Sequence, residues 1–453
     1  MKVIADLQLH SKYARAVSQE MVIPKIGEWA KRKGIKLVAT GDWTHPLWMR
    51  EIKANLVEDG SGLLKLKTEE GPYFLLATEV SSIYSQGGKL RRIHTLIWVP
   101  TIESADKINK ELISRGANLM SDGRPIIGLS SMQVAELVFS IEPQSLIIPA
   151  HAWTPWFSLY GSESGFDSID ECFGSWAKYI YAVETGLSSD PAMNWRIKEL
   201  DSRSIVSFSD AHSGPKLGRE ATVFEVEELS YQKIREAIIQ PSVISKSADQ
   251  SISNKEAENN RIVYTIEFYP EEGKYHYTGH RNCNVKQTPQ ETRTKGTVCP
   301  VCGRKLTVGV MHRVDELAGR TEEELKIYKK KLANTNMMGI FSEALPQRPP
   351  YVMMVPLQEI LSEAVGSMPT SQTVQNEYKK LTDHFGGEFE ILLETSAEEI
   401  GKVSGPKIAE GISKVREGKI VIDPGYDGVF GKVKIWGEEK KEEENKKEQL
   451  SLF

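Results

Sequence analysis

From Met1 to about Val226 the chain repeats one pattern, in which a short apolar run ends at an acidic residue or a histidine and a loop or helix follows. The runs are VIAD at Asp6, IKLVATGD at Asp42, YFLLATE at Glu79, IHTLIWV from His94, SLIIPAH at His151, YIYAVE at Glu184 and SIVSFSDAH at Asp210 and His212. Helical patterns lie between several runs, such as IPKIGEWAKRKG, where Pro24 suits a first turn and Gly34 a C-terminal cap. This alternation predicts parallel strands in a barrel-like α/β fold whose polar side chains meet at the strands' C-terminal ends.

Composition limits the class of protein. A chain of 453 residues with 40% hydrophobic content corresponds to about three globular domains. No apolar stretch approaches the roughly 20 residues of a membrane span. The start MKVIADLQLH lacks the layout of a signal peptide, so we expect no membrane partner and a cytoplasmic protein. The net charge of -5 argues against a surface coated in basic residues but leaves room for a local basic groove.

Four segments are expected along the chain. They are an α/β domain at 1–245, a zinc-binding module at 261–316, a mainly helical DNA-binding region at 317–435 and a charged tail at 437–453. The linker-like stretch SKSADQSISNKEAENN (Ser245 to Asn260) separates the first two. The tail contains GEEKKEEENKKE, which is too charged and too poor in apolar groups to fold alone.

Histidines and carboxylates concentrate in the first segment. Of nine histidines in the chain, those beside its apolar runs are His10, His45, His94, His151 and His212. The acids Asp6, Asp42, Glu79, Glu184 and Asp210 lie in the same contexts. Imidazoles and carboxylates that converge on one rim can hold two or three divalent cations for hydrolysis of phosphate esters. A lone histidine or acid would more often be a core residue or a helix cap, but the repetition favours a metal cluster. Glu184 could instead pair with a basic residue, and Asp42 could cap the turn before His45.

Six short motifs follow one another in the first segment: Asp-x-Gln-x-His-Ser, Gly-Asp-x-x-His, Thr-Glu, Ile-His, Ala-His and Ser-Asp-Ala-His. Their order resembles that of the PHP (polymerase and histidinol phosphatase) superfamily of multinuclear phosphoesterases. That resemblance implies a distorted barrel of seven strands and helices. It also implies metal ligands at His10, Glu79, His94, His151, Asp210 and His212. Asp6 and His45 are expected as ligands too, and Gln8, Asp42 and Glu184 are further candidates. Glu79, Asp210 and His212 are the residues we expect to serve catalysis. Gln8 stands where the superfamily usually has histidine, and an amide oxygen is the weaker ligand.

Three of the four cysteines lie close together in GHRNCNVKQTPQETRTKGTVCPVCGRKL. His280-x2-Cys283 and Cys299-x2-Cys302 have the paired spacing of a closed tetrahedral zinc site, so a structural Zn²⁺ is expected. His276 could replace His280 as the first ligand. Basic residues around these pairs suit either phosphate contacts or a solvated surface.

Two C-terminal motifs suggest partners. The stretch TSAEEIGKVSGPKIAEGI (Thr395 to Ile412) opens with a capping box from Ser396 to Glu399 and resembles the helix-hairpin-helix motif. That motif binds a DNA phosphate through backbone amides, here at Gly405 with Lys407 beside it, although a plain helical hairpin is the alternative. The ending QLSLF resembles the peptide by which repair proteins dock on a sliding clamp, either the bacterial beta clamp or archaeal PCNA. The expected clamp-binding residues are Gln449, Leu450, Leu452 and Phe453.

The combination of these parts resembles the endonuclease Q family over most of the chain. The resemblance implies a metal-dependent DNA repair endonuclease with damaged DNA as partner. It implies cleavage of the phosphodiester 5' to a deaminated base (hypoxanthine, uracil or xanthine) or an abasic site, with two or three catalytic Zn²⁺, Mg²⁺ or Mn²⁺ ions. Trp43, Trp153, Trp156 and Tyr160 are candidates to stack on an extruded base. The alternatives are a small-molecule phosphatase of histidinol-phosphate type and a catalytically weak DNA-binding module.

Overall fold

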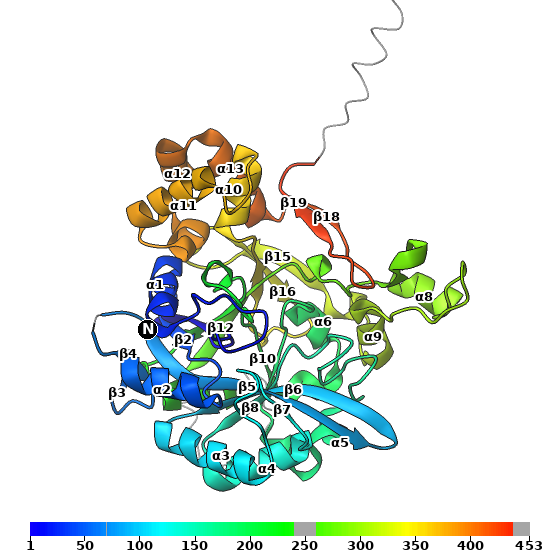
Figure 1. Cartoon of the computed structure of the whole chain (residues 1–453). Coiled ribbons are helices and arrows are strands. Elements are labelled where there is room, and N and C mark those ends of the chain that lie inside the picture. The colour runs from blue at the N-terminus through cyan, green and yellow to red at the C-terminus, as the bar shows by residue number, and fades with distance from the viewer. Residues whose placement is uncertain (69, 240–259, 438–453) are drawn as a thin grey trace, which may run out of the picture.

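The computed structural model describes residues 1–68, 70–239 and 260–437 of the chain. These residues form a mixed α/β protein around a large sheet, with helices on the outside, a helical cluster at one end and a projecting lobe at one side (Figure 1). The predicted α/β class is therefore confirmed.

Each of the seven apolar runs contains a strand. They are β1 (Lys2–Asp6), β2 (Leu37–Ala39), β5 (Tyr73–Gln86), β6 (Lys89–Val99), β8 (Leu146–Pro149), β9 (Ala182–Glu184) and β10 (Ser204–Val206). Pairing runs from β1 through β2, β5 and β6 to β8, and β9 pairs with β10. The amide of Ala152, after β8, donates to the carbonyl of Glu184 in β9. Leu9, after β1, bridges to Ala211, after β10. The strands thus follow one another round a ring, and the segments after the first and last strands lie side by side.

Strand direction follows the prediction in part. β1, β2 and β5 pair in parallel, and so do β9 and β10. β6 is antiparallel to both β5 and β8, so the prediction of parallel strands is wrong there. The reason is a tight hairpin at Gly87 and Gly88, whose φ values of 61° and 73° suit a turn that reverses the chain.

Helices pack around these strands as α1 (Ile23–Lys33), α2 (Pro46–Asn55), α3 (Ile102–Ser114), α4 (Ser131–Ile141), α5 (Ile169–Phe173), α6 (Pro191–Trp195) and α7 (Tyr231–Ile239). The predicted helix signals are confirmed in α1. Pro24 lies in its first turn, and Gly34 caps its C-terminus with φ 86°. Its face with Ile23, Ile26 and Ala30 is buried against the sheet.

The sheet extends beyond the ring. The added strands are β3 (Leu56–Glu58), β4 (Leu64–Leu66), β7 (Ile126–Ile127), β11 (Ala221–Glu225), β12 (Arg261–Glu267), β15 (Ile327–Lys331), β16 (Met338–Ser342) and β17 (Tyr351–Met353). The prediction that a zinc-binding module begins at 261 is wrong for its first residues, because β12 pairs with β11 and β17. The prediction of a mainly helical region from 317 is also wrong at its start. β15 is an exposed edge strand rich in lysine, and lysines protect a sheet edge from pairing with another chain. Its sequence does not alternate apolar and polar residues, so it was not recognised as a strand.

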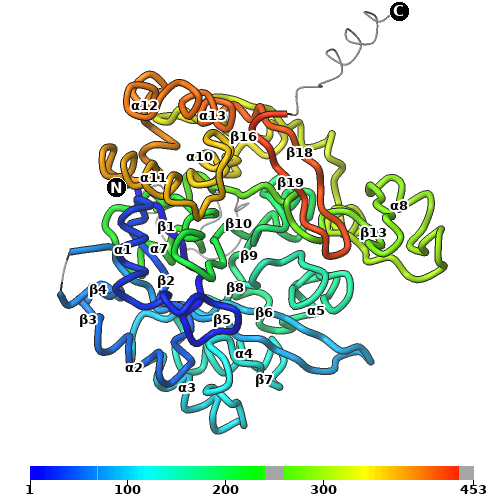
Figure 2. The backbone as a smooth tube through the Cα atoms, turned by 45° about the horizontal axis from the view of Figure 1, so that its top comes forward, coloured from blue at the N-terminus to red at the C-terminus, as the bar shows by residue number. Residues whose placement is uncertain are grey.

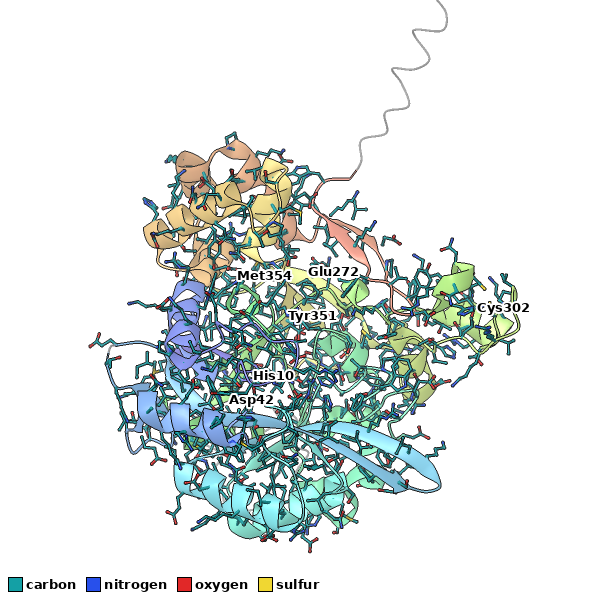
Figure 3. All side chains as sticks on the ribbon, in the orientation of Figure 1. His10, Asp42, Glu272, Cys302, Tyr351 and Met354 are labelled. Carbon is teal, nitrogen blue, oxygen red and sulfur yellow. The ribbon has the colours of Figure 1, made fainter. Side chains whose placement is uncertain are left out.

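The projecting lobe contains β13 (Thr278–His280), β14 (Val285–Gln287), α8 (Pro289–Lys295) and α9 (Val310–Leu317). Cys302 lies at its tip, far from His10 at the centre of the molecule (Figure 3). Any ion at this tip is therefore separate from the strand ends.

The helical cluster contains α10 (Leu357–Val365), α11 (Gln372–Phe385), α12 (Ala397–Ser404) and α13 (Pro406–Glu417). A hairpin of β18 (Val421–Asp423) and β19 (Lys432–Lys434), which was not predicted, runs from the cluster to the lobe (Figure 2). At its tip Tyr426 bridges to Tyr277, and Asp427 accepts a 2.7 Å hydrogen bond from the amide of Arg281. The hairpin therefore ties the lobe to the helical cluster.

A buried ion pair fixes the helical cluster against α1. Lys33 Nζ lies 2.6 Å from Glu388 Oε2, and only 2% of the lysine is exposed. The hydroxyl of Tyr378 donates to the same oxygen at 2.7 Å. The carboxylate thus has the partners that a buried charge needs.

Part of the expected organisation falls outside the described residues. This applies to most of the linker from 245 to 260 and to Gln449, Leu450, Leu452 and Phe453. Among the residues that are described, no helix combines the length and hydropathy needed to cross a membrane.

Candidate metal centre

Six side chains in or shortly after the strands of the ring form two compact groups of metal-binding atoms. One group is His10, Asp210 and His212, and the other is Glu79, His94 and His151. Within each group the ligand atoms all lie within 4.8 Å of one another. These six are the residues that the PHP resemblance assigned as ligands. Glu79 and His94 lie within β5 and β6, and the other four follow β1, β8 and β10.

Glu79 connects the two groups. Its Oε1 lies 2.5 Å from His94 Nδ1 and 3.3 Å from His151 Nε2, while its Oε2 lies 3.1 Å from His10 Nε2. His10 Nε2 is also 3.2 Å from Asp210 Oδ1. Each oxygen of this one carboxylate faces a different group, which is the arrangement of a carboxylate able to bridge two cations.

Asp42 orients the first histidine. Its Oδ1 lies 2.8 Å from His10 Nδ1, and its Oδ2 accepts hydrogen bonds from the amide and the hydroxyl of Ser11 at 2.6 and 2.7 Å. A carboxylate can only accept, so Nδ1 carries a hydrogen. Nε2 faces Glu79 and Asp210, and it is the nitrogen that a neutral His10 would offer to a cation. Asp42 is thus a positioning residue behind His10.

Backbone strain is concentrated at this centre. Asp42, His151 and Asp210 have φ values of 42°, 31° and 47°, in the left-handed region that non-glycine residues seldom adopt. Such strain persists only where the surrounding structure holds it, and it is typical of functional sites.

The electrostatics of the centre favour positive charge. Burial opposes ionisation of Glu79, but the Arg124 guanidinium and the His94 ring outweigh it and hold the pKa of Glu79 well below its ordinary value. Burial likewise opposes the charge of Asp210, yet His10 lowers its pKa to about 2. Burial lowers the pKa of His10, but the Asp42 carboxylate raises it. The net effect is a pKa well above the ordinary value of histidine. The carboxylates are therefore ionised and available to cations.

Two predicted ligands lie outside both groups. The Asp6 carboxylate accepts hydrogen bonds from the amide of Ser209 at 3.0 Å, its hydroxyl at 2.5 Å and the amide of Gly218 at 2.8 Å. It thereby holds the loop that carries Asp210. The His45 ring stacks on Tyr13 with 4.5 Å between centroids.

Two further candidates line the centre and leave buried oxygens without partners. Gln8 Nε2 donates to Glu79 Oε2 at 2.9 Å, and the amide of His151 donates to Glu184 Oε2 at 2.7 Å. Within the described part of the chain, Gln8 Oε1 and Glu184 Oε1 have no hydrogen-bond partner. Burial raises the pKa of Glu184 well above its ordinary value. Unpaired buried oxygens beside ionised carboxylates are what a cation site provides.

Sequence reasoning missed Arg124. Its Nη1 lies 3.4 Å from His10 Nε2 and 3.5 Å from Glu79 Oε1. It precedes the short strand β7, whose pairing with β5 brings this loop to the centre. No motif surrounds it, so only that long-range pairing reveals it.

The prediction that four aromatic side chains could stack on an extruded base is wrong for three of them. Trp43, Trp153 and Tyr160 are fully buried, and Trp153 packs on Tyr160 with 4.6 Å between ring centroids. They belong to the core and cannot receive a base. Trp156 is partly exposed and contacts Tyr275 edge-on at 5.5 Å.

The second candidate metal site lies in the lobe. His280, Cys283, Cys299 and Cys302 place one ligand atom each within 4.8 Å of the others, and Cys302 Sγ lies 3.4 Å from His280 Nδ1. Burial opposes ionisation of Cys299, but the amides of Cys302 and Val301 lower its pKa to about 6. His276, the alternative first ligand, lies outside this group.

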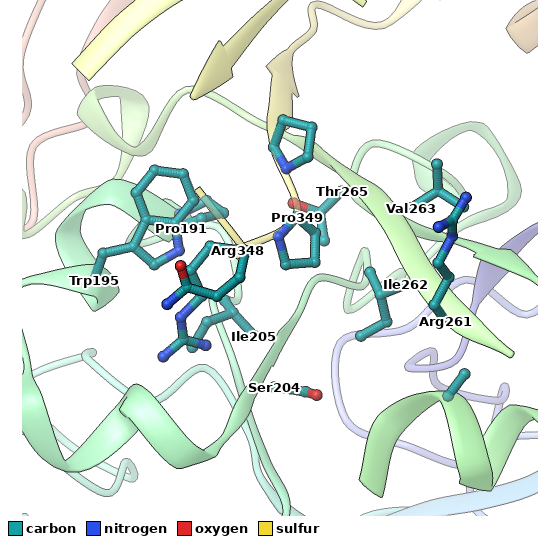
Figure 4. A pocket seen from close by; sticks show the side chains of 13 residues that line it. Pro191, Trp195, Ser204, Ile205, Arg261, Ile262, Val263, Thr265, Arg348 and Pro349 are labelled. Carbon is teal, nitrogen blue, oxygen red and sulfur yellow. The ribbon is translucent and has the colours of Figure 1, made fainter. Parts of the chain in front are cut away.

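A cavity of 290 Å³ is shown with its lining side chains in Figure 4. Trp195, Arg348 and Pro349 line it together with Ser204 and Ile205 at the start of β10. Asp210 follows the opposite end of that strand. None of the lining residues belongs to either metal group.

The predicted capping box is present in α12, where Ser396 and Glu399 exchange hydrogen bonds. Gly405 joins α12 to α13 with φ 88°. Lys407 follows in the first turn of α13, with Nζ 5.5 Å from the Trp436 ring centroid.

Comparisons with known proteins give the following matches. Residues 356–419 match the family described as the MJ0043 C-terminal domain. The protein MJ0043 of Methanocaldococcus jannaschii is 31% identical over 290 residues, which cover 62% of this chain. The chain spans only 31% of the length of MJ0043. YqxK of Bacillus subtilis is 28% identical over 453 residues, covering 96% of this chain and 99% of YqxK.

Two solved structures are similar over nearly their whole length. One is the lesion-specific endonuclease PfuEndoQ from Pyrococcus furiosus, with a TM-score of 0.78, 30% identity and coverage of 100% of both chains. The other is Endonuclease Q in complex with a 27-mer duplex substrate that has an abasic lesion at the active site. Its TM-score is 0.77 and its identity 32%, with coverage of 97% of this chain and 98% of that one.

Proposed function

Because the chain belongs to the endonuclease Q family, we propose that it is a metal-dependent DNA repair endonuclease. Its substrate in this proposal is DNA with a deaminated base (hypoxanthine, uracil or xanthine) or an abasic site, cut at the phosphodiester on the 5' side of the lesion. The products are a 3'-hydroxyl and a 5'-phosphate. The abasic lesion bound at the active site of a similar endonuclease supports this substrate class.

The observation that carries the proposal is the position of Glu79 between two groups of ligands. The donor set fits divalent cations in three respects. Oxygen and imidazole nitrogen atoms converge within each group, His10 Nε2 lies beside two carboxylates, and buried oxygens of Gln8 and Glu184 lack partners within the described residues.

In this proposal both ligand groups hold catalytic ions. One group is His10, Asp210 and His212, and the other is Glu79, His94 and His151. When bound, such ions lower the pKa of a coordinated water and stabilise the oxygens of a phosphoryl transfer. The chain's own contribution is to fix the ligands. Asp42 sets the tautomer of His10, Asp6 holds the loop of Asp210, and the His151 amide is held by Glu184.

Selectivity for damaged DNA has a simple physical source. Deaminated bases pair weakly and an abasic site has no base to unpair, so extruding the lesion costs less than extruding a normal nucleotide. Trp156 is the remaining aromatic candidate for contact with an extruded base, because it follows His151 closely and is partly exposed.

The other parts are assigned as follows. The ring of seven strands is the distorted PHP-type barrel of residues 1–245, and His280, Cys283, Cys299 and Cys302 hold a structural Zn²⁺ in the lobe. Gly405 and Lys407 contact the DNA backbone, with the amides at the start of α13 as donors. The tail from 437 to 453 tethers the enzyme to a sliding clamp through Gln449, Leu450, Leu452 and Phe453.

The test is a nicking assay. A 5'-labelled duplex with a single deoxyinosine is incubated with the protein and Mg²⁺ or Mn²⁺, beside the undamaged duplex and the variant Asp210→Ala. We expect one lesion-dependent nick on the 5' side of the inosine, and none with the variant. An absent nick, or an undiminished nick with Asp210→Ala, would contradict the proposal.

A further inference from the structure

Arg124 lies at the open side of the metal centre. Its side chain is 25% exposed, as against 1% for His10 and Glu79 and 9% for His94. Asp210 and His212, at 21% and 34%, are the other open members. A ligand that approaches the centre therefore meets the guanidinium together with these two residues.

The guanidinium has unused donors. Of its five N–H groups, only those on Nη1 have a partner within the described residues, at His10 Nε2 and Glu79 Oε1. Nε and Nη2 remain available. The neighbouring Arg219 differs, because it donates to the backbone carbonyls of Ser209 and Asp210 and has a structural role there.

The two partners of Nη1 are atoms that the proposed ions would use. In the metal-loaded enzyme these atoms are not free for Arg124, so the guanidinium needs another anion. A phosphate group is the anion that the proposed reaction delivers to this place, and a planar guanidinium matches two phosphate oxygens.

We propose that Arg124 is a catalytic residue that binds the non-bridging oxygens of the scissile phosphate. This assignment rests on the proposed endonuclease function and adds to it a phosphate contact made by the chain itself. A fixed cation beside these oxygens stabilises the charge that builds up during phosphoryl transfer. Arg124 would also align the phosphate with the ligand groups.

A purely structural role for Arg124 makes a different prediction. If it only neutralised the buried Glu79 carboxylate, its loss would weaken metal binding and stability and would be indifferent to the charge of the DNA phosphate. The two roles are separated by combining a protein variant with a change in one phosphate of the DNA.

The experiment is a double-mutant cycle on binding. Arg124→Gln is compared with wild type on an abasic-site duplex whose scissile phosphate is either normal or a neutral methylphosphonate. Affinity is measured by fluorescence anisotropy of the full-length protein with Ca²⁺, after a check that no nick forms. Arg15→Gln is the matched control, because Arg15 is exposed on the adjoining loop, where its amide contacts Asp122.

The methylphosphonate should weaken wild-type binding by about tenfold, the value of a charge-assisted hydrogen bond. It should weaken Arg124→Gln by several-fold less than wild type, because one partner of the phosphate is already gone and only the bound cations still attract its charge. Arg15→Gln should respond like wild type. With Mn²⁺ the single-turnover nicking rate of Arg124→Gln should fall by about 100-fold. Arg124→Lys should recover part of that rate, and metal content by mass spectrometry should stay unchanged.

Three results would overturn the assignment. The first is an equal methylphosphonate effect in wild type and Arg124→Gln, and the second is a loss of bound metal that explains the lost rate. The third is a wild-type protein without a lesion-dependent nick, which would remove the proposed function itself. This third result differs from the first two because it is measured on the wild-type protein alone.

Discussion

The most informative substitution is Asp42→Asn, which tests how the fold sets the protonation of His10. Asp42 accepts three hydrogen bonds, one from His10 at 2.8 Å and two from Ser11 at 2.6 and 2.7 Å. Asparagine keeps one acceptor oxygen and gains an amino group. Since Ser11 presents two donors, the amide oxygen stays there and the amino group faces His10 Nδ1. Asparagine tolerates the φ of 42° at this position, so backbone strain does not explain the effect.

An amino group at Nδ1 moves the imidazole hydrogen to Nε2, and the first group then loses one of its two nitrogen ligands. A single charge-assisted hydrogen bond is worth about 1.5–3 kcal/mol, which corresponds to a factor of about 10 to 100. Substitutions of this kind behind a metal ligand weaken metal affinity by about the same factor. We therefore expect Mn²⁺ to bind Asp42→Asn about 10 to 100 times more weakly than wild type.

The assay is a Mn²⁺ titration of the purified protein followed by electron paramagnetic resonance of the free ion. Ser11→Ala is the matched control, because it removes one donor to Asp42 and leaves the contact with His10 intact. Its affinity should stay within about threefold of wild type. If Asp42→Asn also stayed within about threefold, the tautomer argument would be refuted.

Further substitutions test other parts of the structure. Gln8→His should retain lesion-dependent nicking and change the relative rates with Mg²⁺, Mn²⁺ and Zn²⁺, since imidazole replaces an amide beside the centre; an inactive enzyme would refute this. Cys302→Ser should lower both the melting temperature and the amount of zinc that the protein retains after dialysis. The affinity of the metal centre around Glu79 for Mn²⁺ should stay unchanged. Lys33→Met should lower the free energy of unfolding, measured with urea, by about 3–5 kcal/mol, because it leaves the Glu388 carboxylate buried without its cation. The double variant that also contains Glu388→Gln should recover part of this free energy. Burial raises the pKa of Glu267 to about 8, so its contribution to stability is present below about pH 4.5 and is lost as the pH rises through 8. Glu267→Gln should therefore raise the melting temperature at pH 9 and not at pH 4; an equal shift at both would count against a titrating carboxyl.

Local signals in the sequence predicted much of this structure. Pro24 and Gly34 marked the ends of α1, and Ser396 with Glu399 marked the start of α12. Runs of apolar residues that end at polar ones identified the seven strands, because the strand period fixes where a polar side chain emerges. The repetition of histidines and acids beside these runs predicted that such side chains would meet, and the PHP resemblance selected the six of the two ligand groups.

Features that depend on long-range pairing could not be predicted in this way. β12 joins the sheet through β11 and β17, and Arg124 reaches the centre because β7 pairs with β5. Loop position likewise did not reveal that Trp43 and Trp153 are buried. The reversal of β6 is different, since Gly87 and Gly88 were a hairpin signal within the sequence itself.

The claim that two cations flank Glu79 can be tested by crystals soaked in Mn²⁺ and measured at the manganese absorption edge. The structure predicts two anomalous peaks, one among His10, Asp210 and His212 and one among Glu79, His94 and His151. A single peak remote from Glu79, or no peak at these six residues, would contradict the claim.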